Sequence, residues 1–464
     1  MLPVKGLRDL NENTPGSVRF PRLSSVAARV KLLYSRPTRM AHLIPSLAHT
    51  HWIPATIFCL TYLFIAIESS RGSHLDRTAA AFCGAVAMVL AGALTLGDAY
   101  KAIDWNTLIF LLGMMILVAH FQVSGVFDWI AIHVSSVART RLQLLLILVL
   151  TSGILAAFFV NDTICLIFTP IVLAVTDRLK VPPIPYLMAL ATSANVGSVM
   201  SVTGNPQNAL VGISAHLSFL AFLFHLAPVA LIGLAINAAV LAFFFRGEVL
   251  HQPLERQAPS LTIALDRPLL AKCLLSGLLV VALWVAGYSF PLVAISVGAF
   301  ILLIGRVKSA NIYQHIDWEL LLFFAALFIV MRGFEASGAV DYLIGHFHHA
   351  LEGSMISQLF AVSGVMLVLS NLVSNVPAVL LFRPLVSSFP NSRFIWLAVA
   401  STSTLAGNAT PISSVANLIV LHRAGQSVQI SFWKFARVGI VVTLLTTLVA
   451  IAVLAAEFML LGKF

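Results

Sequence analysis

Charged residues are scarce in this sequence. Only 10% of the 464 residues are Asp, Glu, Lys or Arg, whereas soluble domains contain about 25%. The mean hydropathy is +0.96, and 59% of the residues are hydrophobic. This composition excludes an ordinary soluble globular protein. Because apolar runs long enough to cross a bilayer recur along almost the whole chain, we predict an all-α polytopic membrane protein.

Cysteine is also scarce, and the sequence motifs of common enzymes are missing. The four cysteines stand singly, without CxxC or CxxH spacing, so neither a disulfide framework nor a zinc site is indicated. No HExxH, GxSxG or paired-aspartate motif is found, which argues against an enzyme. His346, His348 and His349 lie in an amphipathic segment and are interpreted as solvated side chains. We therefore expect no catalytic residue, no metal site and no cofactor.

The net charge of +10 is interpreted as a topology signal, with no nucleic-acid partner. Residues 1–48 form a basic tail without the apolar core of a secretory signal. Most other basic residues fall in loops that alternate along the chain, and the positive-inside rule places those loops in the cytoplasm. This set is Arg71, Arg77, Arg139, Arg141, Arg178, Lys180, Arg246, Arg256, Arg267, Arg306, Lys308, Arg423, Lys434 and Arg437. The opposite side keeps only Lys101, Arg393 and Lys463 apart from the tail. Because the basic tail would then lie outside, we expect either an extra membrane element or a translation start at Met40.

The chain contains an internal duplication. AIDWNTLIFLLGMMILVAHFQVSGVFDWI from Ala102 resembles HIDWELLLFFAALFIVMRGFEASGAVDYLI from His315, with the shared residues 213 positions apart. We predict a first repeat over 49–246, a cytoplasmic linker over 247–268 and a second repeat over 269–464. Since each half has an odd number of crossings, the halves must be inverted relative to each other, as in many transporters.

Each repeat contains one apolar stretch whose length does not match a whole number of crossings. The 142–176 stretch has 35 residues, which is too short for two crossings and too long for one. Its middle carries Asn161-Asp162-Thr163, and the corresponding middle of 354–389 carries Ser374-Asn375. A re-entrant hairpin with a polar tip inside the protein explains this pattern. We therefore predict about ten spanning helices and two re-entrant hairpins.

A span interrupted by small and polar residues follows each hairpin. The first is SANVGSVMSVTGNPQN and the second is STLAGNATPISSVAN. Glycine and proline break a helix and free its backbone groups. We predict two broken helices that complete, with the two tips, one composite site near the membrane midplane. The candidate ion- or substrate-binding residues are Asn161, Asp162, Thr163, Gly204, Asn205, Asn208, Ser374, Asn375, Gly407, Asn408 and Asn417.

Two charged residues in the hairpins each allow two interpretations. Asp162 is the only charge between Leu142 and Thr176, and acids within a membrane mark ion or proton paths. Its carboxylate could instead cap the helix that follows the tip. Arg383, the only charge of the second hairpin, is either an interfacial anchor or a group that attracts an anion. We expect Asp162 to bind and release a proton, or to pair with a cation.

NDTICLIFTP, GNPQN, SNVP and LAGNATPISSVANLIV resemble the ion transporter superfamily. This superfamily contains arsenite-efflux permeases, sodium/proton antiporters, citrate transporters and divalent-anion/sodium symporters. The resemblance covers about residues 50–461. It implies an inverted repeat with two re-entrant hairpins, an elevator-type movement and a homodimer. The sodium–dicarboxylate branch carries an SNT triplet at both tips, and this chain departs from that pattern at both.

The sequence thus predicts a secondary active transporter for a small ion or anion, embedded in the lipid of the plasma (inner) membrane as a multi-pass protein. The driving ion is H⁺, or Na⁺ in the alternative of a sodium-coupled carboxylate or anion symporter. An alternative of another class is a passive channel. The substrate, which ranges from arsenite or sodium to a carboxylate or an inorganic oxyanion, is left open.

Overall fold

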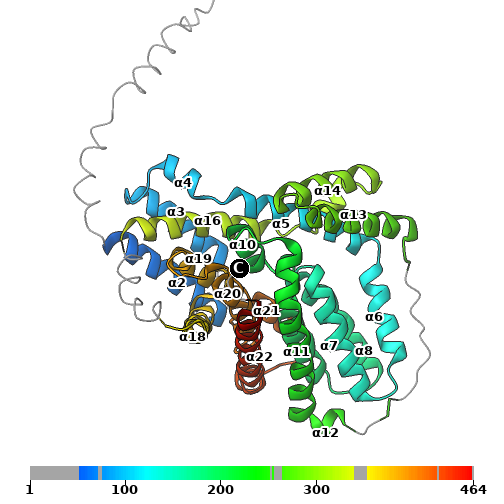
Figure 1. The fold of residues 1–464 in the computed structure, drawn as a ribbon. Coiled ribbons are helices and arrows are strands. Elements are labelled where there is room, and N and C mark those ends of the chain that lie inside the picture. Colours follow the sequence, from blue (N-terminus) through cyan, green and yellow to red (C-terminus); the bar gives the residue numbers. More distant parts are fainter. Residues whose placement is uncertain are drawn as a thin grey trace, which may run out of the picture. The chain divides into compact units, whose positions relative to one another are not determined.

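The computed structural model describes residues 52–71, 76–250, 253–254, 264–338, 353–425 and 428–461. The tail over 1–48, half of the linker over 247–268 and the histidines at 346–349 lie outside these residues. The helices are α2 (Trp52–Arg71), α3 (Arg77–Leu90), α4 (Leu96–Ala102), α5 (Trp105–Val123), α6 (Val126–Val137), α7 (Arg141–Phe158), α8 (Asn161–Arg178), α9 (Ile184–Ser198), α10 (Pro206–Ser214), α11 (Phe219–Phe244), α12 (Arg246–Val249), α13 (Arg267–Val285), α14 (Phe290–Ile304), α15 (Ser309–Tyr313), α16 (Trp318–Ala336), α18 (Met355–Val373), α19 (Asn375–Val386), α20 (Ser392–Ala406), α21 (Val415–Ala424) and α22 (Phe432–Leu461) (Figure 1).

The element order confirms the internal duplication. Helices α3, α4, α5, α7 and α8 correspond in order to α14, α15, α16, α18 and α19. The start of each long helix is built alike: Asp104 accepts a hydrogen bond from Thr107 N at 3.2 Å, and Asp317 accepts one from Leu320 N at 2.8 Å. Both aspartates are therefore N-caps. The local sequence encodes the same helix start twice.

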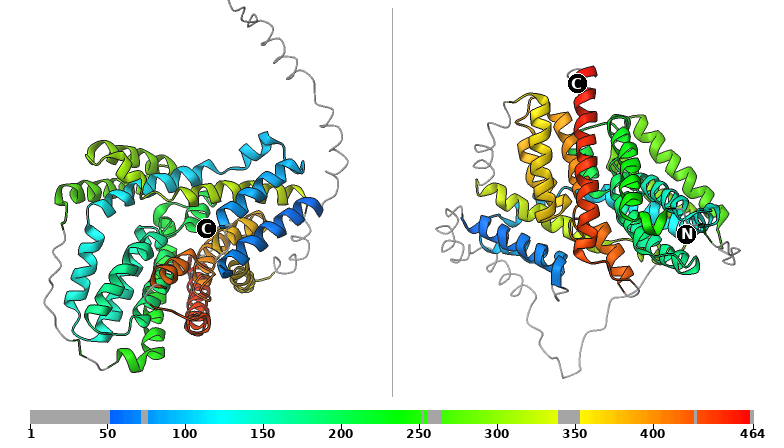
Figure 2. Two further views of the ribbon diagram at one scale, coloured as in Figure 1. Left: turned by 180° about the vertical axis from the view of Figure 1, so that it is seen from behind. Right: turned by 90° about the horizontal axis from the view of Figure 1, so that it is seen from below.

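Helix contacts follow the same symmetry and divide the fold into two layers. In the first layer, α5 packs against α13 and α14, and the equivalent α16 packs against α2 and α3. In the second layer, α7 packs on α9 and α18 on α20, while α11 and α22 pack against each other. Figure 2 shows α22 crossing this second layer as one long helix. We call these groups the scaffold layer and the hairpin layer.

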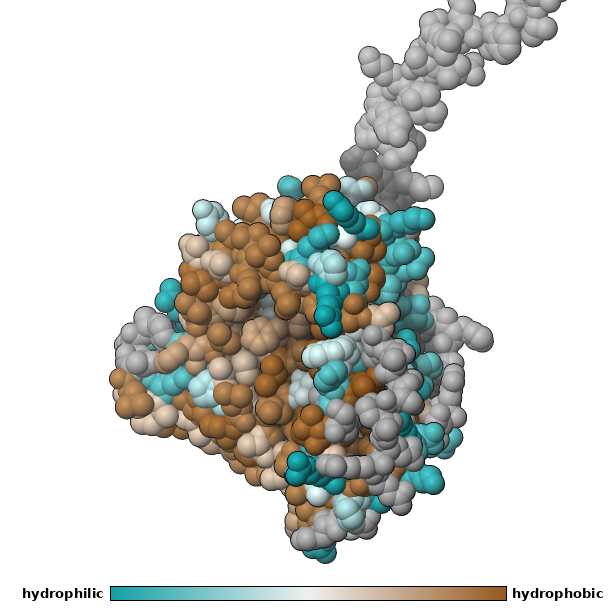
Figure 3. All heavy atoms as spheres, turned by 90° about the vertical axis from the view of Figure 1, so that its right-hand side faces the viewer, coloured by the Kyte–Doolittle hydropathy of each residue, from teal (hydrophilic) through white to brown (hydrophobic). Residues whose placement is uncertain are grey.

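The surface is apolar enough for a membrane protein. Among the described residues, six helices are long and apolar enough to cross a membrane, namely Trp105–Val123, Arg141–Phe158, Phe219–Phe244, Arg267–Val285, Met355–Val373 and Phe432–Leu460. Brown, hydrophobic atoms cover much of the face drawn in Figure 3. On α13, for example, Leu275 and Leu278 are 63% and 68% exposed. Such leucines face lipid at no cost, because the hydrocarbon core of a bilayer is apolar too.

Candidate functional site

Four helix N-termini converge on one small cavity. The residues that begin α8, α10, α19 and α21 line a space of about 30 Å³. Two of these helices follow the hairpin tips and two follow the breaks in the interrupted spans. The lining is Asn161, Asp162, Pro206, Gln207, Leu320, Phe323, Phe324, Ser374, Asn375, Val376, Pro377, Ser414 and Val415. Both predicted hairpin tips therefore line one cavity.

The four helix ends give the cavity a positive character without any basic side chain. The aligned peptide dipoles of a helix place roughly half a positive charge at its N-terminus. No Lys, Arg or His is among the residues that line this cavity, and Asp162 supplies its only ionisable group. A helix N-terminus favours anions and electron-rich oxygen atoms. The cavity therefore suits a small ligand that presents oxygen atoms.

Asp162 lies in the first turn of α8, and its carboxylate is not a cap. The N-cap residue of α8 is Val160, and no side chain makes a capping hydrogen bond there. The backbone N–H of Asp162 donates to Asn161 Oδ1 at 3.0 Å. Within the described part of the chain, the Asp162 carboxylate has neither a hydrogen bond nor an ion pair. Arg77 and Asp317 act on it only through space. The capping interpretation of Asp162 is therefore wrong, and its side chain is left to face the cavity.

Behind the cavity, Asn195 connects the two repeats. Its Oδ1 accepts hydrogen bonds from Asn161 Nδ2 at 2.9 Å and from Ser414 Oγ at 3.0 Å. Its Nδ2 donates to Asn408 Oδ1 at 3.0 Å and to Asn417 Oδ1 at 3.1 Å. Asn195 is 0% exposed. Asn195 lies in the SANVGS segment but was not among the candidate residues. The available signal was an amide side chain within an otherwise apolar helix.

Thr404 of α20 occupies the symmetric position. It accepts hydrogen bonds from Asn205 Nδ2 and Gln207 Nε2, both at 3.2 Å, and lies 3.4 Å from Asn208 Oδ1. Thr404 is 209 residues from Asn195, which is also the separation of Asn208 and Asn417. Each repeat thus extends one polar residue into the broken helix of the other. Gln207 and Ser414, which line the cavity, are further residues that the sequence analysis missed.

The predicted asparagines of the broken helices mainly satisfy freed carbonyl groups. Asn208 Nδ2 donates to Ser198 O and Ser201 O, each at 2.9 Å. Asn417 Nδ2 donates to Gly407 O at 2.6 Å and to Thr410 O at 3.1 Å. Because unpaired backbone groups are costly in a membrane, these asparagines stabilise the two helix breaks. They lie behind the cavity, as do Asn205 and Asn408.

The two predicted glycines are required by close contacts. A Cβ on Gly204 would collide with the carbonyl oxygen of Ser198, and the Gly204 carbonyl accepts from Asn161 N at 2.9 Å. A Cβ on Gly407 would lie 2.9 Å from Asn375 Nδ2. In the amide orientation that satisfies both of its polar atoms, Asn375 donates to Ser403 O and Ser413 O. Gly204 and Gly407 therefore let each tip reach the break of its own repeat.

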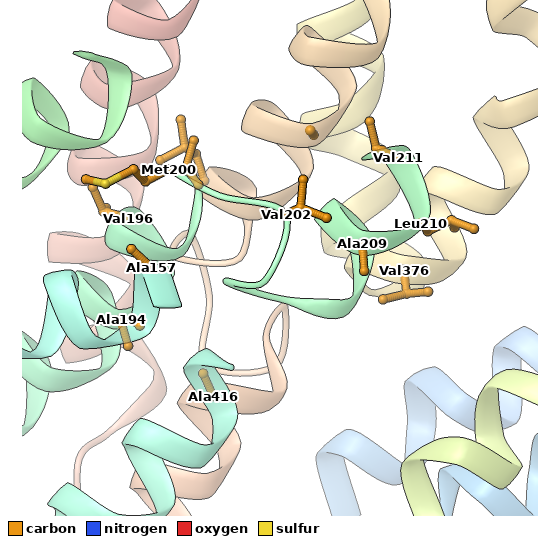
Figure 4. Packing of buried hydrophobic residues seen from close by; sticks show 14 of the residues in the cluster. Ala157, Ala194, Val196, Met200, Val202, Ala209, Leu210, Val211, Val376 and Ala416 are labelled. Carbon is orange, nitrogen blue, oxygen red and sulfur yellow. The ribbon is translucent and has the colours of Figure 1, made fainter. Parts of the chain in front are cut away.

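Small apolar residues surround the same junction. Figure 4 shows Ala157, Ala194 and Ala416 around the helix ends, and Val376 of α19 beside Ala209 of α10. All five are buried, with 0% to 8% exposure. Small side chains allow helix ends to approach closely. The polar network is thus enclosed in a tightly packed apolar shell.

Two predicted residues lie elsewhere. Thr163 is partly buried in the first turn of α8 and is not among the residues that line the small cavity. Arg383 Nη1 lies 3.7 Å from Asp104 Oδ2, with the Arg383 side chain 44% exposed. Arg383 lines neither the small cavity nor the large one described next. Its structural surroundings agree with an anchoring role.

A larger cavity of about 820 Å³ adjoins the small one and shares Ser374 and Val415 with it. It lies between α16 and α21 and is lined by Ile65, Arg77, Leu166, Glu319, Asn371, Leu372, Val373, Ser374, Ile412, Val415, Leu418, Ile419, Leu421, His422 and Arg423. We call it the vestibule. Arg77 and Arg423 belong to the loops that the charge distribution assigns to the cytoplasm. The vestibule therefore leads from the small cavity toward the basic side.

The opposite side is packed. By the repeat symmetry, the pair α10 and α5 corresponds to α21 and α16. Helix α10 contacts α5 directly, whereas the vestibule separates α21 from α16. The ion pair between Arg383 and Asp104 also lies at the start of α5. Within the described part of the chain, the surroundings of the small cavity are thus asymmetric, with the vestibule on the basic side.

Comparisons with known proteins agree with this architecture. The sequence model of a family described as "Citrate transporter" matches residues 62–402. An uncharacterized transporter of Mycobacterium bovis is 31% identical over 418 residues, covering 84% of this chain and 95% of that protein. The "Silicon efflux transporter LSI3" of Oryza sativa subsp. japonica is 25% identical, covering 81% and 92%. The "Arsenical pump membrane protein" of Yersinia enterocolitica is 26% identical, covering 87% and 98%.

Among solved structures, the YdaH transporter of Alcanivorax borkumensis is similar in fold. The TM-score is 0.55 at 13% sequence identity, and the alignment covers 89% of this chain and 99% of that one. That structure is described as having an unusual topology. At this identity the likeness concerns the fold alone.

Proposed function

The chain belongs to the citrate transporter family, and we propose that within it the protein is a secondary transporter for a small oxygen-rich acid or its anion. The membership supports a membrane transporter and confirms the resemblance to the ion transporter superfamily. We further propose that Asp162 carries the coupling proton. The observation that carries the proposal is the small cavity where four helix N-termini surround one carboxyl group.

The size and lining of the cavity favour a small substrate over citrate. A volume of about 30 Å³ holds little more than a water-sized group, whereas sites for drug-sized ligands measure about 300–1,000 Å³. A tricarboxylate is much larger than this space. Amide groups, hydroxyl groups and helix N-termini instead match the oxygens of a hydroxylated inorganic acid. The names of the rice and Yersinia relatives, which mention silicon and an arsenical, point to the same class.

Asp162 is suited to link a proton to this substrate. An ionised carboxylate in the cavity would repel an anion and occupy the positive helix ends itself. A protonated Asp162 removes that charge and can donate a hydrogen bond to the substrate. Because the Asp162 carboxylate lacks a fixed partner, both forms are accessible without breaking a structural bond. Substrate binding and protonation of Asp162 are thereby coupled.

The one-sided access supports alternating access. The vestibule reaches the small cavity from the basic side, while α10 and α5 are packed on the other. Exchanging the conformations of the two repeats would close the vestibule and open the opposite side. We propose that the hairpin layer moves as an elevator against the scaffold layer.

A sodium-coupled carboxylate or anion symporter is a second candidate. Amide and carboxylate oxygens, such as those of Asn161, Asp162 and Asn375, are suitable ligands for hard cations. The small cavity could then hold Na⁺ while the vestibule holds a carboxylate near Arg77 and Arg423. This candidate predicts flux of citrate driven by a sodium gradient.

Flux in proteoliposomes separates the candidates. Arsenite, silicic acid, inorganic phosphate and citrate are each offered with a pH gradient or a sodium gradient imposed separately. We expect saturable, pH-gradient-driven flux of one small inorganic acid. Citrate flux that needs sodium would favour the second candidate, and ohmic single-channel currents would indicate a passive channel.

The role of Asp162 is tested with Asp162→Asn, which keeps the shape of the side chain but cannot ionise. We expect this variant to lose pH-gradient-driven flux while keeping its fold. Asp128→Asn is the matched control, because Asp128 also lies in the first turn of a helix but is exposed and away from the cavity. If Asp162→Asn still couples flux to the pH gradient, the coupling proton binds elsewhere.

The homodimer and the plasma (inner) membrane are further proposals, which rest on the family resemblance. Inter-subunit cross-linking in native membranes tests the first, and membrane fractionation tests the second.

A further inference from the structure

A third cavity lies at the other end of the hairpin layer, away from the vestibule. It measures about 220 Å³ and is lined by His216, Leu217, Ser218, Ala221, His225, Arg393 and Leu397. These residues come from the turn before α11, the first turns of α11 and the start of α20. Arg393 belongs to the few basic residues on the side opposite the cytoplasmic loops. We call this space the outer cavity.

The lining of the outer cavity is cationic. Arg393 is permanently charged, His216 and His225 are basic, and no carboxylate is among its lining residues. The cavity also adjoins the N-terminus of α11, a helix of 26 residues that begins after the N-cap Ser218. Its first N–H groups add to the positive potential. A guanidinium group, imidazoles and a helix N-terminus together form a set of donors suited to an anion.

His225 shows that this arrangement is built into the fold. Its side chain is only 2% exposed, and its Nδ1 lies 2.6 Å from Glu457 Oε2 of α22. The ring of Phe394 packs on His225 with centroids 5.9 Å apart. The Glu457 carboxylate thus fixes the imidazole at the cavity wall from behind. A buried polar group held in this way is costly unless its partners are in place.

The duplication argues that the outer cavity is separate from the transport machinery. Positions 213 residues after Ser218 and His225 hold Ser431 and Val438. The position 213 residues before Glu457 holds Phe244. The His225–Glu457 pair therefore has no counterpart in the other repeat, whereas Arg393 corresponds to the basic residue Lys180. A feature that both repeats needed for transport would be expected in both.

We propose that the outer cavity is a binding site for a phosphate-type oxyanion, held by Arg393, His225 and the N-terminus of α11. A cavity of about 220 Å³ accommodates a tetrahedral oxyanion with some water. The same chemistry fits free inorganic phosphate and the headgroup phosphate of a lipid in the outer leaflet. The proposal is independent of the transported substrate.

The test measures stabilisation of the purified full-length protein in detergent. One arm adds sodium phosphate, with sodium chloride at matched ionic strength as the reference, because general screening must be subtracted. The other arm adds a short-chain phosphatidic acid below its micelle concentration. A ligand that binds only the folded state raises the melting temperature with concentration. We expect specific stabilisation in at least one arm.

Variants locate the site. Arg393→Gln and His225→Gln should each weaken the apparent affinity at least tenfold. Arg332→Gln is the matched control, since Arg332 is 57% exposed and lies outside the outer cavity. Stabilisation by phosphate alone identifies a free oxyanion, and stabilisation by the lipid alone identifies a headgroup. If neither ligand stabilises the wild type, or if Arg393→Gln responds like wild type, the proposal is wrong. Because Arg393 is exposed, its variant should fold even if His225→Gln does not.

Discussion

Removing the side chain of Asn195 should destabilise the protein more than removing any other single polar side chain of the hairpin layer. Four hydrogen bonds of 2.9–3.1 Å meet at its amide, from Asn161 and Ser414 and to Asn408 and Asn417. Hydrogen bonds between membrane helices contribute about 0.6 kcal/mol on average and about 1.7 at most. Each buried polar group that loses its hydrogen-bond partner costs about 1–3 kcal/mol unless water reaches it. We expect Asn195→Ala to lose about 2–4 kcal/mol.

Asn237 is the matched control. It is likewise 0% exposed on an apolar helix, α11, but neither its Oδ1 nor its Nδ2 has a hydrogen-bond partner among the described residues. Asn237→Ala should therefore cost less than about 1 kcal/mol or even stabilise, because an unpaired polar group is removed. Thr404→Ala should fall between, since its three contacts are longer, at 3.2–3.4 Å.

The assay is unfolding of the purified variants by SDS in mixed micelles, followed by near-ultraviolet circular dichroism. The free energy of unfolding should rank wild type above Thr404→Ala and Thr404→Ala above Asn195→Ala. The reasoning is refuted if Asn195→Ala lies within about 0.5 kcal/mol of wild type. It is also refuted if Asn237→Ala loses as much as Asn195→Ala, because burial rather than bonding would then set the cost.

Three further predictions follow from single contacts. Asp162→Ala and Asp162→Asn should unfold at the same SDS concentration, because the carboxylate makes no cap. A lower unfolding midpoint for Asp162→Ala alone would support the interpretation of Asp162 as a helix cap. Arg383→Gln should remove the half-exposed ion pair with Asp104, which is worth about 0–1 kcal/mol. Loss of this pair should slow the labelling of a cysteine placed in the vestibule by up to about fivefold. Faster labelling would contradict this prediction. Gly204→Ala should abolish folded protein on size-exclusion chromatography, whereas Gly247→Ala, where a Cβ meets nothing within 4 Å, should elute as wild type.

Much of the fold follows from the sequence alone. Apolar runs with few charges can only be membrane helices, because each helix satisfies its own backbone within the bilayer. The Asp-Trp pairs at 104 and 317 mark the duplication, and an odd number of crossings per repeat implies the inversion. Length was a weaker guide to the hairpins. Helix α7 alone is long enough to cross a membrane, so only the meeting of its tip with Ser374 in one cavity identifies the hairpin as re-entrant.

The sequence also indicated which segments form the site, because polar residues in apolar runs are expensive and need a reason. Asn161, Asp162, Ser374 and Asn375 were selected in this way, and all four line the small cavity. What the polar residues do could not be read from the sequence. An amide side chain that bonds to the freed carbonyl groups of a broken helix is chemically identical to one that faces a substrate, and both have similar neighbours in the sequence.

The tertiary structure alone decided these roles. Asn208 and Asn417 bind carbonyl groups seven to ten residues earlier in the chain, so local geometry consumes their donors. Asn195 bonds to residues that lie 213 and 222 positions away, a pairing that exists only once the inverted repeats are packed together. The convergence of four helix N-termini is likewise a property of three-dimensional packing. Hydropathy is a local property that can be read from the sequence, whereas these contacts depend on where distant segments meet in the folded protein.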